Sequence, residues 1–232
     1  MHRQLNTPDH ASRVQTLFSE LAPSYDRYNR IFSLGLDILW RKRLVEAVVN
    51  RQPSAVLDLA CGSGDVTLAL QNAIPTARIT GLDFCPALLA QATARGVQHV
   101  VEGDALQLPF SDESFSAVTL AFGLRNFSDR PKALREIHRV LQSGGLLALL
   151  EFSPPPYPWK LFWDFYLFRF MPWVAQRLTR QGESFRYLAQ SIAQFPAPSA
   201  LHHELQTAGL KLLFTRPMSL RLVRLTVCRK VS

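Results

Sequence analysis

From residue 54 to residue 152 the chain alternates short, almost uninterrupted apolar runs with segments of helical periodicity. The apolar runs are AVLDLA (55–60), ARITGLD (77–83), VQHVVEGD (97–104), FSAVTLAF (115–122) and GLLALLEF (145–152). Strands that are buried on both faces have such continuous apolar sequences, and helices connect consecutive strands of a parallel sheet. The pattern therefore predicts an α/β fold in which helices cover both faces of a mostly parallel sheet.

Helical sequence precedes this core. Residues 10–50 have helical character, and their spacing predicts one apolar stripe. The stripe comprises Leu36, Leu39, Trp40, Leu44, Ala47 and Val48. The segment SYDRYNRIFSLG, which lies before the stripe, has turn character. We expect residues 1–50 to form a helical cap over the functional site.

The sequence after the core has a different texture. A helix near 198–208, closed by Gly209, precedes candidate strands at 210–215 and 222–229. A short turn separates these strands, so we expect an antiparallel hairpin at the edge of the sheet. We interpret residues 1–232 as one domain, with the core at 54–152, an insert at 153–195, and a C-terminal helix and hairpin at 196–232.

The composition indicates the cellular compartment and the kind of partner to expect. The 232 residues are 47% hydrophobic and carry a net charge of +8, which is typical either of contact with an anionic partner or of solubility alone. The three cysteines, Cys61, Cys85 and Cys228, form no paired motif and favour a reducing compartment. A signal peptide and an apolar run of about 18 residues are both lacking in the sequence. We expect a cytoplasmic protein, in solution or peripheral on the inner face of the membrane.

The segment VLDLACGSGD at 56–65 predicts a strand, a tight turn and the start of a helix. Asp58 lies on the strand, and Gly62 and Gly64 let a ligand approach the backbone closely. Asp83 ends the next strand, 21 residues beyond Gly62, and Asp104 follows the third strand. These carboxylates can accept hydrogen bonds from the ribose hydroxyls and the adenine amine of a nucleoside. Each aspartate alone is also typical of a helix N-cap, but together they favour a nucleoside pocket.

Two cofactor classes compete for this pocket. A nicotinamide dinucleotide needs a third glycine and a helix N-terminus that is free for its pyrophosphate. Thr67 occupies the position of the third glycine, and Asp65 places a negative charge where the diphosphate would bind. An acidic loop with two glycines is better suited to S-adenosylmethionine, which carries a sulfonium and an ammonium and has no phosphate.

Longer motifs surround the glycine loop. They are APSYDRYNRIFSLGLDILWRK (22–42), GDALQLPFSDESF (103–115), AFGLRNFSDRPKALREIHRVL (121–141), GGLLALLEFSPP (144–155) and FRYLAQSIAQFP (185–196). With them the chain resembles the demethylmenaquinone and 2-polyprenyl-benzoquinol C-methyltransferases of menaquinone and ubiquinone synthesis, from about residue 13 to residue 212. Two departures, Asp37-Ile38 in place of a frequent His-Arg pair and a C-terminal strand without the usual glycine, leave the choice of quinone ring open.

The resemblance implies a Rossmann-like class I methyltransferase fold with a seven-stranded sheet. It implies C-methylation of a reduced, prenylated quinone with S-adenosylmethionine as the cofactor. The cofactor-binding candidates are Asp58, Gly62, Ser63, Gly64, Asp83, Asp104, Ala105 and Ala121. Two other functions stay open: methylation of another apolar small molecule, and a non-catalytic module in a quinone-synthesis assembly.

A quinol ring carbon becomes a methyl acceptor when the neighbouring hydroxyl ionises. At neutral pH, ionising a phenol of pKa about 10 costs roughly 4 kcal/mol. Arg125 of FGLRN is too basic to remove a proton, so we expect it to stabilise the oxyanion, with Asn126 as a hydrogen-bond partner. Tyr25 orients the quinol or covers the sulfonium, and Asp26 or water takes the proton. The alternative for Arg125 is an ion pair with a nearby acid such as Asp129.

The insert contains nine aromatic residues between positions 157 and 173. They are Tyr157, Trp159, Phe162, Trp163, Phe165, Tyr166, Phe168, Phe170 and Trp173. One interpretation is a helical lid that packs over the sheet, and the other is an apolar gate that admits a prenylated quinol from the bilayer. We expect no nucleic-acid partner, because a separate RNA-binding module is lacking, and no metal, because His202-His203 has no third ligand at metal spacing. The sequence leaves open whether the chain forms a homodimer.

Overall fold

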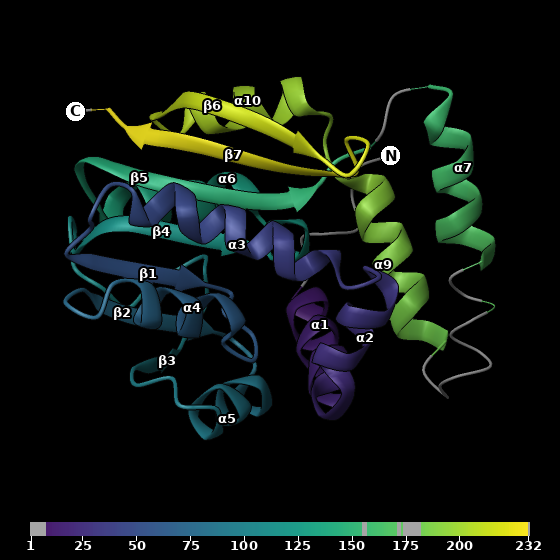
Figure 1. Ribbon diagram of the computed structural model, residues 1–232, viewed down its shortest axis with the longest axis horizontal. Coiled ribbons are helices and arrows are strands. Elements are labelled where there is room, and N and C mark those ends of the chain that lie inside the picture. The colour runs from purple at the N-terminus through teal and green to yellow at the C-terminus, as the bar shows by residue number, and fades with distance from the viewer. Residues whose placement is uncertain (1–7, 155–156, 171–172, 174–181, 232) are drawn as a thin grey trace.

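A computed structural model describes residues 8–154, 157–170, 173 and 182–231 (Figure 1). Within these residues, seven strands form one sheet in the order β3-β2-β1-β4-β5-β7-β6. Their bounds are β1 (Ala55–Leu59), β2 (Arg78–Asp83), β3 (Val100–Glu102), β4 (Phe115–Ala121), β5 (Leu141–Phe152), β6 (Leu210–Met218) and β7 (Val223–Lys230). Every apolar run of the predicted core contributes one strand.

The first five strands are parallel, and the last two form the predicted hairpin. β1 lies between β2 and β4, and all five of its residues are buried, as expected for a strand covered on both faces. β7 pairs antiparallel with β5 on one side and with β6 on the other, so β6 is the edge strand. The expected antiparallel hairpin at the sheet edge is confirmed.

Helices cover both faces of the sheet (Figure 1). They are α1 (Pro8–Leu21), α2 (Tyr25–Phe32), α3 (Leu36–Val49), α4 (Asp65–Ala73), α5 (Pro86–Ala94), α6 (Arg130–Val140), α7 (Trp159–Phe165), α9 (Gly182–Gln194) and α10 (Pro198–Thr207), with single turns η1 (Ala22–Ser24), η2 (Leu124–Asn126) and η3 (Tyr166–Phe170). One core packs α3 and α4 against the sheet, and the other packs α6 and α10 against the opposite face. The two layers leave the carboxyl ends of the parallel strands for the cap and the insert.

The predicted stripe of α3 is only partly correct. Trp40, Leu44 and Val48 are buried against the sheet, but Leu36 and Leu39 are 39% and 47% exposed. Asp37 is buried in their place, because it lies one helical turn before Trp40 on the same face. An apolar count alone therefore placed the start of the stripe one residue too early.

The cap and the insert pack against each other beyond the strand ends. The segment expected to be a turn, SYDRYN, forms α2 instead. Leu167 of η3 and Ile192 of α9 are buried in one small cluster with residues of α2, and the Tyr166 hydroxyl donates to the Phe32 carbonyl oxygen at 2.9 Å. Within the insert, η3 and α7 thus pack against α9, and together they contact α2 of the cap and Phe152 of β5. Among the described residues, every helix is too short or too polar to cross a membrane.

Candidate active site

A cavity of about 620 Å³ opens at the carboxyl ends of β1, β2, β3 and β4, and we name it the strand-end cavity. Its wall includes Gly62 after β1, Asp83 at the end of β2, Asp104 and Ala105 after β3, and Ala121 at the end of β4. Glu102 adds a third carboxylate. Among the described residues that line this cavity, none is lysine, arginine or histidine. The wall is therefore acidic.

The two aspartates of the first strands have different surroundings. Asp83 lines the cavity, and its Oδ2 and Oδ1 accept hydrogen bonds from the backbone N–H groups of Gly62 (2.8 Å) and Cys85 (3.0 Å). Asp58 lies below the loop, where the hydroxyls of Thr67 and Thr119 donate to its two oxygens at 2.6 and 2.8 Å. Burial raises the pKa of Asp58 to about 6 and also raises that of Asp83. Asp58 therefore supports the loop from beneath, whereas Asp83 forms part of the wall.

The two glycines of the loop meet different neighbours. Gly62 lines the cavity, and a Cβ added to it would lie 3.6 Å from Tyr25 Cε1. A Cβ on Gly64 would lie 2.6 Å from Val97 Cγ2 and 3.1 Å from Ala92 Cβ. Gly62 therefore leaves space in the cavity beside Tyr25, whereas the close approach of α4 to α5 explains Gly64.

Ser63 and Asp26 join the loop to the cap outside the cavity. The Ser63 hydroxyl donates to Asp26 Oδ1 at 2.5 Å, and Arg95 Nη1 donates to Asp26 Oδ2 at 2.9 Å. Arg95 also binds Asp65 at 2.6 Å. Burial acts to raise the pKa of Asp65, but Arg41 and Arg95 together hold it below its ordinary value. The sequence had led us to expect that Asp65 makes the cofactor loop acidic. In the structure Asp65 instead pairs with arginines and does not line the cavity.

These pairs belong to a longer series of alternating charges, which we name the ionic chain. It comprises Arg30, Asp37, Arg41, Asp65, Arg95 and Asp26. Arg41 of α3 contacts both Asp37 and Asp65, and Arg30 of α2 contacts Asp37 at 2.8 Å. The chain therefore links α2, α3, α4 and the end of α5 around the glycine loop.

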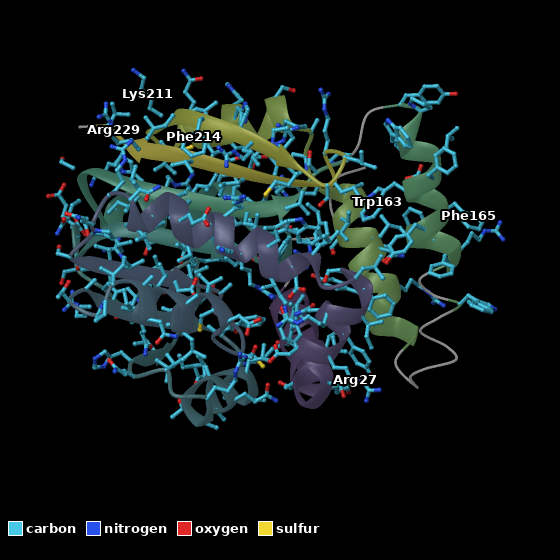
Figure 2. The ribbon with its side chains drawn as sticks, viewed as in Figure 1. Arg27, Trp163, Phe165, Lys211, Phe214 and Arg229 are labelled. Atoms are coloured by element: carbon cyan, nitrogen blue, oxygen red, sulfur yellow. The ribbon has the colours of Figure 1, made fainter. Side chains whose placement is uncertain are left out.

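A second cavity, of about 600 Å³, lies between the cap and the insert, and we name it the apolar cavity. Side chains from α7 and η3 form one wall, including Trp159, Phe162 and Trp163. Figure 2 shows Trp163 on the side of α7 that faces the body of the protein, whereas Phe165 points away from it. Polar residues of α2 and α3, among them Asp37, form a small part of the opposite wall.

The two cavities meet at a shared wall. Tyr25, Ala121 and Phe122 line both of them. Burial raises the pKa of the Tyr25 phenol, so it is protonated at neutral pH. These three residues therefore border both cavities.

Arg125 lines the apolar cavity and is held in a buried ion pair. Its Nη1 donates to Glu151 Oε1 at 2.9 Å and to the Phe122 carbonyl oxygen, and its Cζ lies 5.3 Å from the centre of the Phe152 ring. Its Nε is buried and has no partner among the described residues. The acid that pairs with Arg125 is therefore Glu151 of β5. The alternative considered for Arg125, an ion pair with a nearby acid, is thus present in the structure, but Asp129 is not that acid: it caps α6, where it accepts a hydrogen bond from Lys132 N.

Comparison with known proteins identifies the family. The model of the ubiE/COQ5 methyltransferase family matches residues 6–218. The chain belongs to this methyltransferase family. A demethylmenaquinone methyltransferase of Thermus thermophilus is 44% identical over 204 residues, which cover 85% of this chain and 93% of that protein. The demethylmenaquinone methyltransferase of Thermotoga maritima is 41% identical over 212 residues, covering 90% and 91%.

Solved structures give the fold. A SAM-dependent methyltransferase of Thermotoga maritima superimposes with a TM-score of 0.67 at 17% identity, over 93% of this chain and 98% of that chain. The cyclase SpnF superimposes with a TM-score of 0.61 at 20% identity, over 82% and 80%. The expected Rossmann-like class I methyltransferase fold is thus confirmed. Because a cyclase shares it, the fold alone does not define the reaction.

Within this ubiE/COQ5 methyltransferase, the candidate residues divide by position. Those that line a cavity are Tyr25, Gly62, Asp83, Asp104, Ala105, Ala121, Arg125 and Asn126. Those that line neither cavity are Asp26, Asp58, Ser63 and Gly64. Burial raises the pKa of the Cys61 thiol, so this thiol is protonated at neutral pH. Sequence reasoning missed Glu102 and the α1 residues Gln15 and Phe18, which line the strand-end cavity, and it missed Glu151, which pairs with Arg125.

Proposed function

We propose that the protein transfers a methyl group from S-adenosylmethionine to a ring carbon of demethylmenaquinol. The observation that carries this proposal is the pair of cavities that meet at Tyr25, Ala121 and Phe122. One is acidic and lies at the glycine loop, and the other is large and mostly apolar. The naphthoquinol ring is favoured over a benzoquinol because the relatives are named demethylmenaquinone methyltransferases.

The strand-end cavity suits S-adenosylmethionine. Asp83 and Asp104 line this cavity, and we expect them to bind the ribose and the adenine amine, while Gly62 adds no side chain that would fill the space. A wall with three carboxylates and no basic residue among the described ones favours a cation and disfavours a pyrophosphate. When bound, the cofactor supplies a methyl group that its sulfonium has already activated.

The residues around the acceptor ring have to orient it, exclude water and stabilise its ionised form. Arg125 lines the apolar cavity, and its Nη1 donates to the carbonyl oxygen of Phe122, which is one of the shared residues. Its unpartnered Nε can donate to the ring oxygen, and Glu151 fixes the opposite side of the guanidinium. Asn126 accepts a hydrogen bond from the Tyr187 hydroxyl at 3.1 Å, so its role is to position the η2 turn.

Proton removal from the methylated ring carbon requires an acceptor. Asp26 is excluded by its position, because it lines neither cavity and its oxygens bind Ser63 and Arg95. Tyr25 is protonated at neutral pH, since burial raises its pKa, and a protonated phenol cannot take the proton. We therefore assign the proton to water at the polar edge of the apolar cavity.

The test is methyl transfer from labelled S-adenosylmethionine to demethylmenaquinol and to the corresponding demethylated benzoquinol, under anaerobic reducing conditions. We expect a methylated naphthoquinol. Arg125→Lys keeps the charge but loses the planar donor group, so its turnover at saturating cofactor should fall by about 10²-fold or more. Lack of product with both quinols contradicts the function, and wild-type turnover by Arg125→Lys contradicts the assigned role.

We further propose that the protein meets the membrane through the aromatic surface of its insert. This surface comprises Tyr157, Trp159, Phe162, Phe165, Phe168, Phe170 and Trp173, which are each 45–78% exposed. Trp159, Phe162 and Phe165 also line the apolar cavity, so its wall continues directly into this surface. A prenylated quinol could then pass from the bilayer into the cavity without crossing water.

A further inference from the structure

The apolar cavity contains few hydrogen-bond donors, and most of them have partners within the protein. Trp40 Nε1 donates to Ser219 Oγ at 2.9 Å, and the Tyr166 hydroxyl donates to the Phe32 carbonyl oxygen. Ser33 Oγ donates to Asp37 Oδ1 at 2.7 Å. The protein's own acceptors therefore occupy these donors, and they need no ligand.

Two buried donors on the same cavity lack partners. Among the described residues, Trp163 Nε1 and Arg125 Nε are buried and bind no acceptor, and both residues line the apolar cavity. Buried N–H groups are rarely left without an acceptor, because they have lost water and gained nothing in return. An otherwise apolar cavity with two such groups suits a ligand that is mostly apolar and carries two acceptor atoms.

Both donor side chains lie near the side chain of Phe152. The Arg125 Cζ lies 5.3 Å from the centre of the Phe152 ring, and the centres of the Trp163 and Phe152 rings are 6.5 Å apart. The indole is held flat by Tyr166, whose ring stacks on it at 5.5 Å with an interplanar angle of 13°. This stacking restricts the orientation of the indole plane, which favours a donor that binds one ligand geometry.

We propose that Trp163 is a specificity-determining residue, which donates from Nε1 to the second oxygen of the acceptor ring while Arg125 binds the oxygen beside the methyl-accepting carbon. The inference rests on the proposed function, since it takes the ligand of the apolar cavity to be a quinol. It implies that the site selects a ring with two oxygens on opposite sides over a ring with one.

The test compares two ligands that differ in a single hydroxyl. They are 2-geranyl-1,4-naphthoquinol and 3-geranyl-1-naphthol; the second keeps the hydroxyl beside the acceptor carbon and lacks the one beside the prenyl chain. Their dissociation constants are measured by equilibrium titration under anaerobic reducing conditions. We expect wild type to bind the quinol about five- to tenfold more tightly, as one neutral hydrogen bond provides. Equal affinities in wild type would overturn the proposal without any variant.

Trp163→Phe removes the N–H and keeps an aromatic ring against Tyr166. We expect it to bind both ligands equally, with an affinity for the naphthol close to that of wild type. The control is Phe168→Leu, at an exposed aromatic residue of the neighbouring turn η3 that lines neither cavity, and it should keep the wild-type ratio. A wild-type ratio in Trp163→Phe would overturn the proposal.

Turnover measured in parallel separates this inference from the proposed function. Methylation of the quinol, together with an unchanged affinity ratio in Trp163→Phe, overturns the role of Trp163 and leaves the function standing. If Trp163→Phe loses the affinity ratio but wild type methylates neither ligand, the result supports Trp163 as a donor and overturns the proposed function.

Discussion

Gly62 and Gly64 have φ angles of +57° and +88°, which side chains rarely adopt. Beyond this shared constraint, their surroundings differ. Gly62 faces the strand-end cavity, and Gly64 faces Val97 and Ala92, which pack α5 against the start of α4. Substitution of the two residues should therefore affect two different properties of the protein.

Gly64→Ala should lower the free energy of unfolding by about 2–4 kcal/mol, because it combines left-handed strain with overlap at Val97. Gly62→Ala should lower it by about 1–2 kcal/mol, from the strain alone, and should weaken S-adenosylmethionine binding by about tenfold or more, because the methyl group enters the cavity. Urea denaturation and calorimetric titration measure the two effects. Equal stability losses with wild-type cofactor affinity in both variants would refute this division.

Arg125 illustrates which part of a site can be predicted from sequence. Its position after β4 could be predicted, since FGLRN directly follows an apolar run, and the structure places Arg125 on a cavity wall. Its partner could not. Glu151 lies on the next strand, and only the parallel pairing of β4 with β5 brings the two residues together. Asp129 is closer in the sequence, but the start of α6 uses its carboxylate.

At the scale of elements, the ionic chain joins the cap to the core. Asp26 of α2 binds both Ser63 and Arg95, so the cap is tied to the loop that forms the strand-end cavity. The Arg95 and Asp26 side chains are 36% and 38% exposed, so each pair is individually weak in water. Their shared partners make the effect of removing one member larger than that of an isolated pair. The residues of the ionic chain are charged and follow no apolar period, so no pattern in the sequence predicts their pairing.

Arg95→Gln should loosen α2 without unfolding the core. It removes the ion pairs to Asp26 and Asp65, so we expect hydrogen exchange of the α2 amides to accelerate about three- to tenfold, while α6 amides keep their wild-type rates. High salt should reduce the difference, because it screens exposed pairs. Arg43→Gln is the matched control, since Arg43 forms an isolated, exposed pair with Glu46. The same acceleration in both variants would argue against a specific role of the ionic chain.

At the scale of the whole molecule, the sheet could be predicted more fully than the cavities. Each strand corresponds to a local apolar run, and the apolar side chains of that run alone predict that the strand is buried. The cavities depend on which segments fold back over the strand ends. Gln15 and Phe18 of α1 reach the strand-end cavity, where Gln15 Nε2 donates to the Phe84 carbonyl oxygen at 2.7 Å. A contact across 69 residues has no local pattern that would predict it.

The insert and the hairpin provide two exposed apolar surfaces that can be compared. Phe162 and Phe165 of the insert are 69% and 63% exposed beside the apolar cavity, and Leu213 and Phe214 of β6 are 37% and 43% exposed. Figure 2 shows Phe214 over the sheet edge, away from Trp163 and Phe165. Both surfaces have basic residues close by in the sequence, so charge alone does not distinguish them.

Vesicle flotation should distinguish them. We expect wild type to float with phosphatidylcholine vesicles that contain phosphatidylglycerol, and a Phe162→Ser/Phe165→Ser variant to partition about 10²-fold more weakly, since burying one phenylalanine contributes about 1.5–3 kcal/mol. A Leu213→Ser/Phe214→Ser variant should float as wild type does. Omitting the anionic lipid should weaken wild-type binding, because Lys160 and Arg169 lie within the aromatic surface and each contributes about 1 kcal/mol near an anionic membrane. Equal flotation of the two double variants would rule out the insert as the membrane contact.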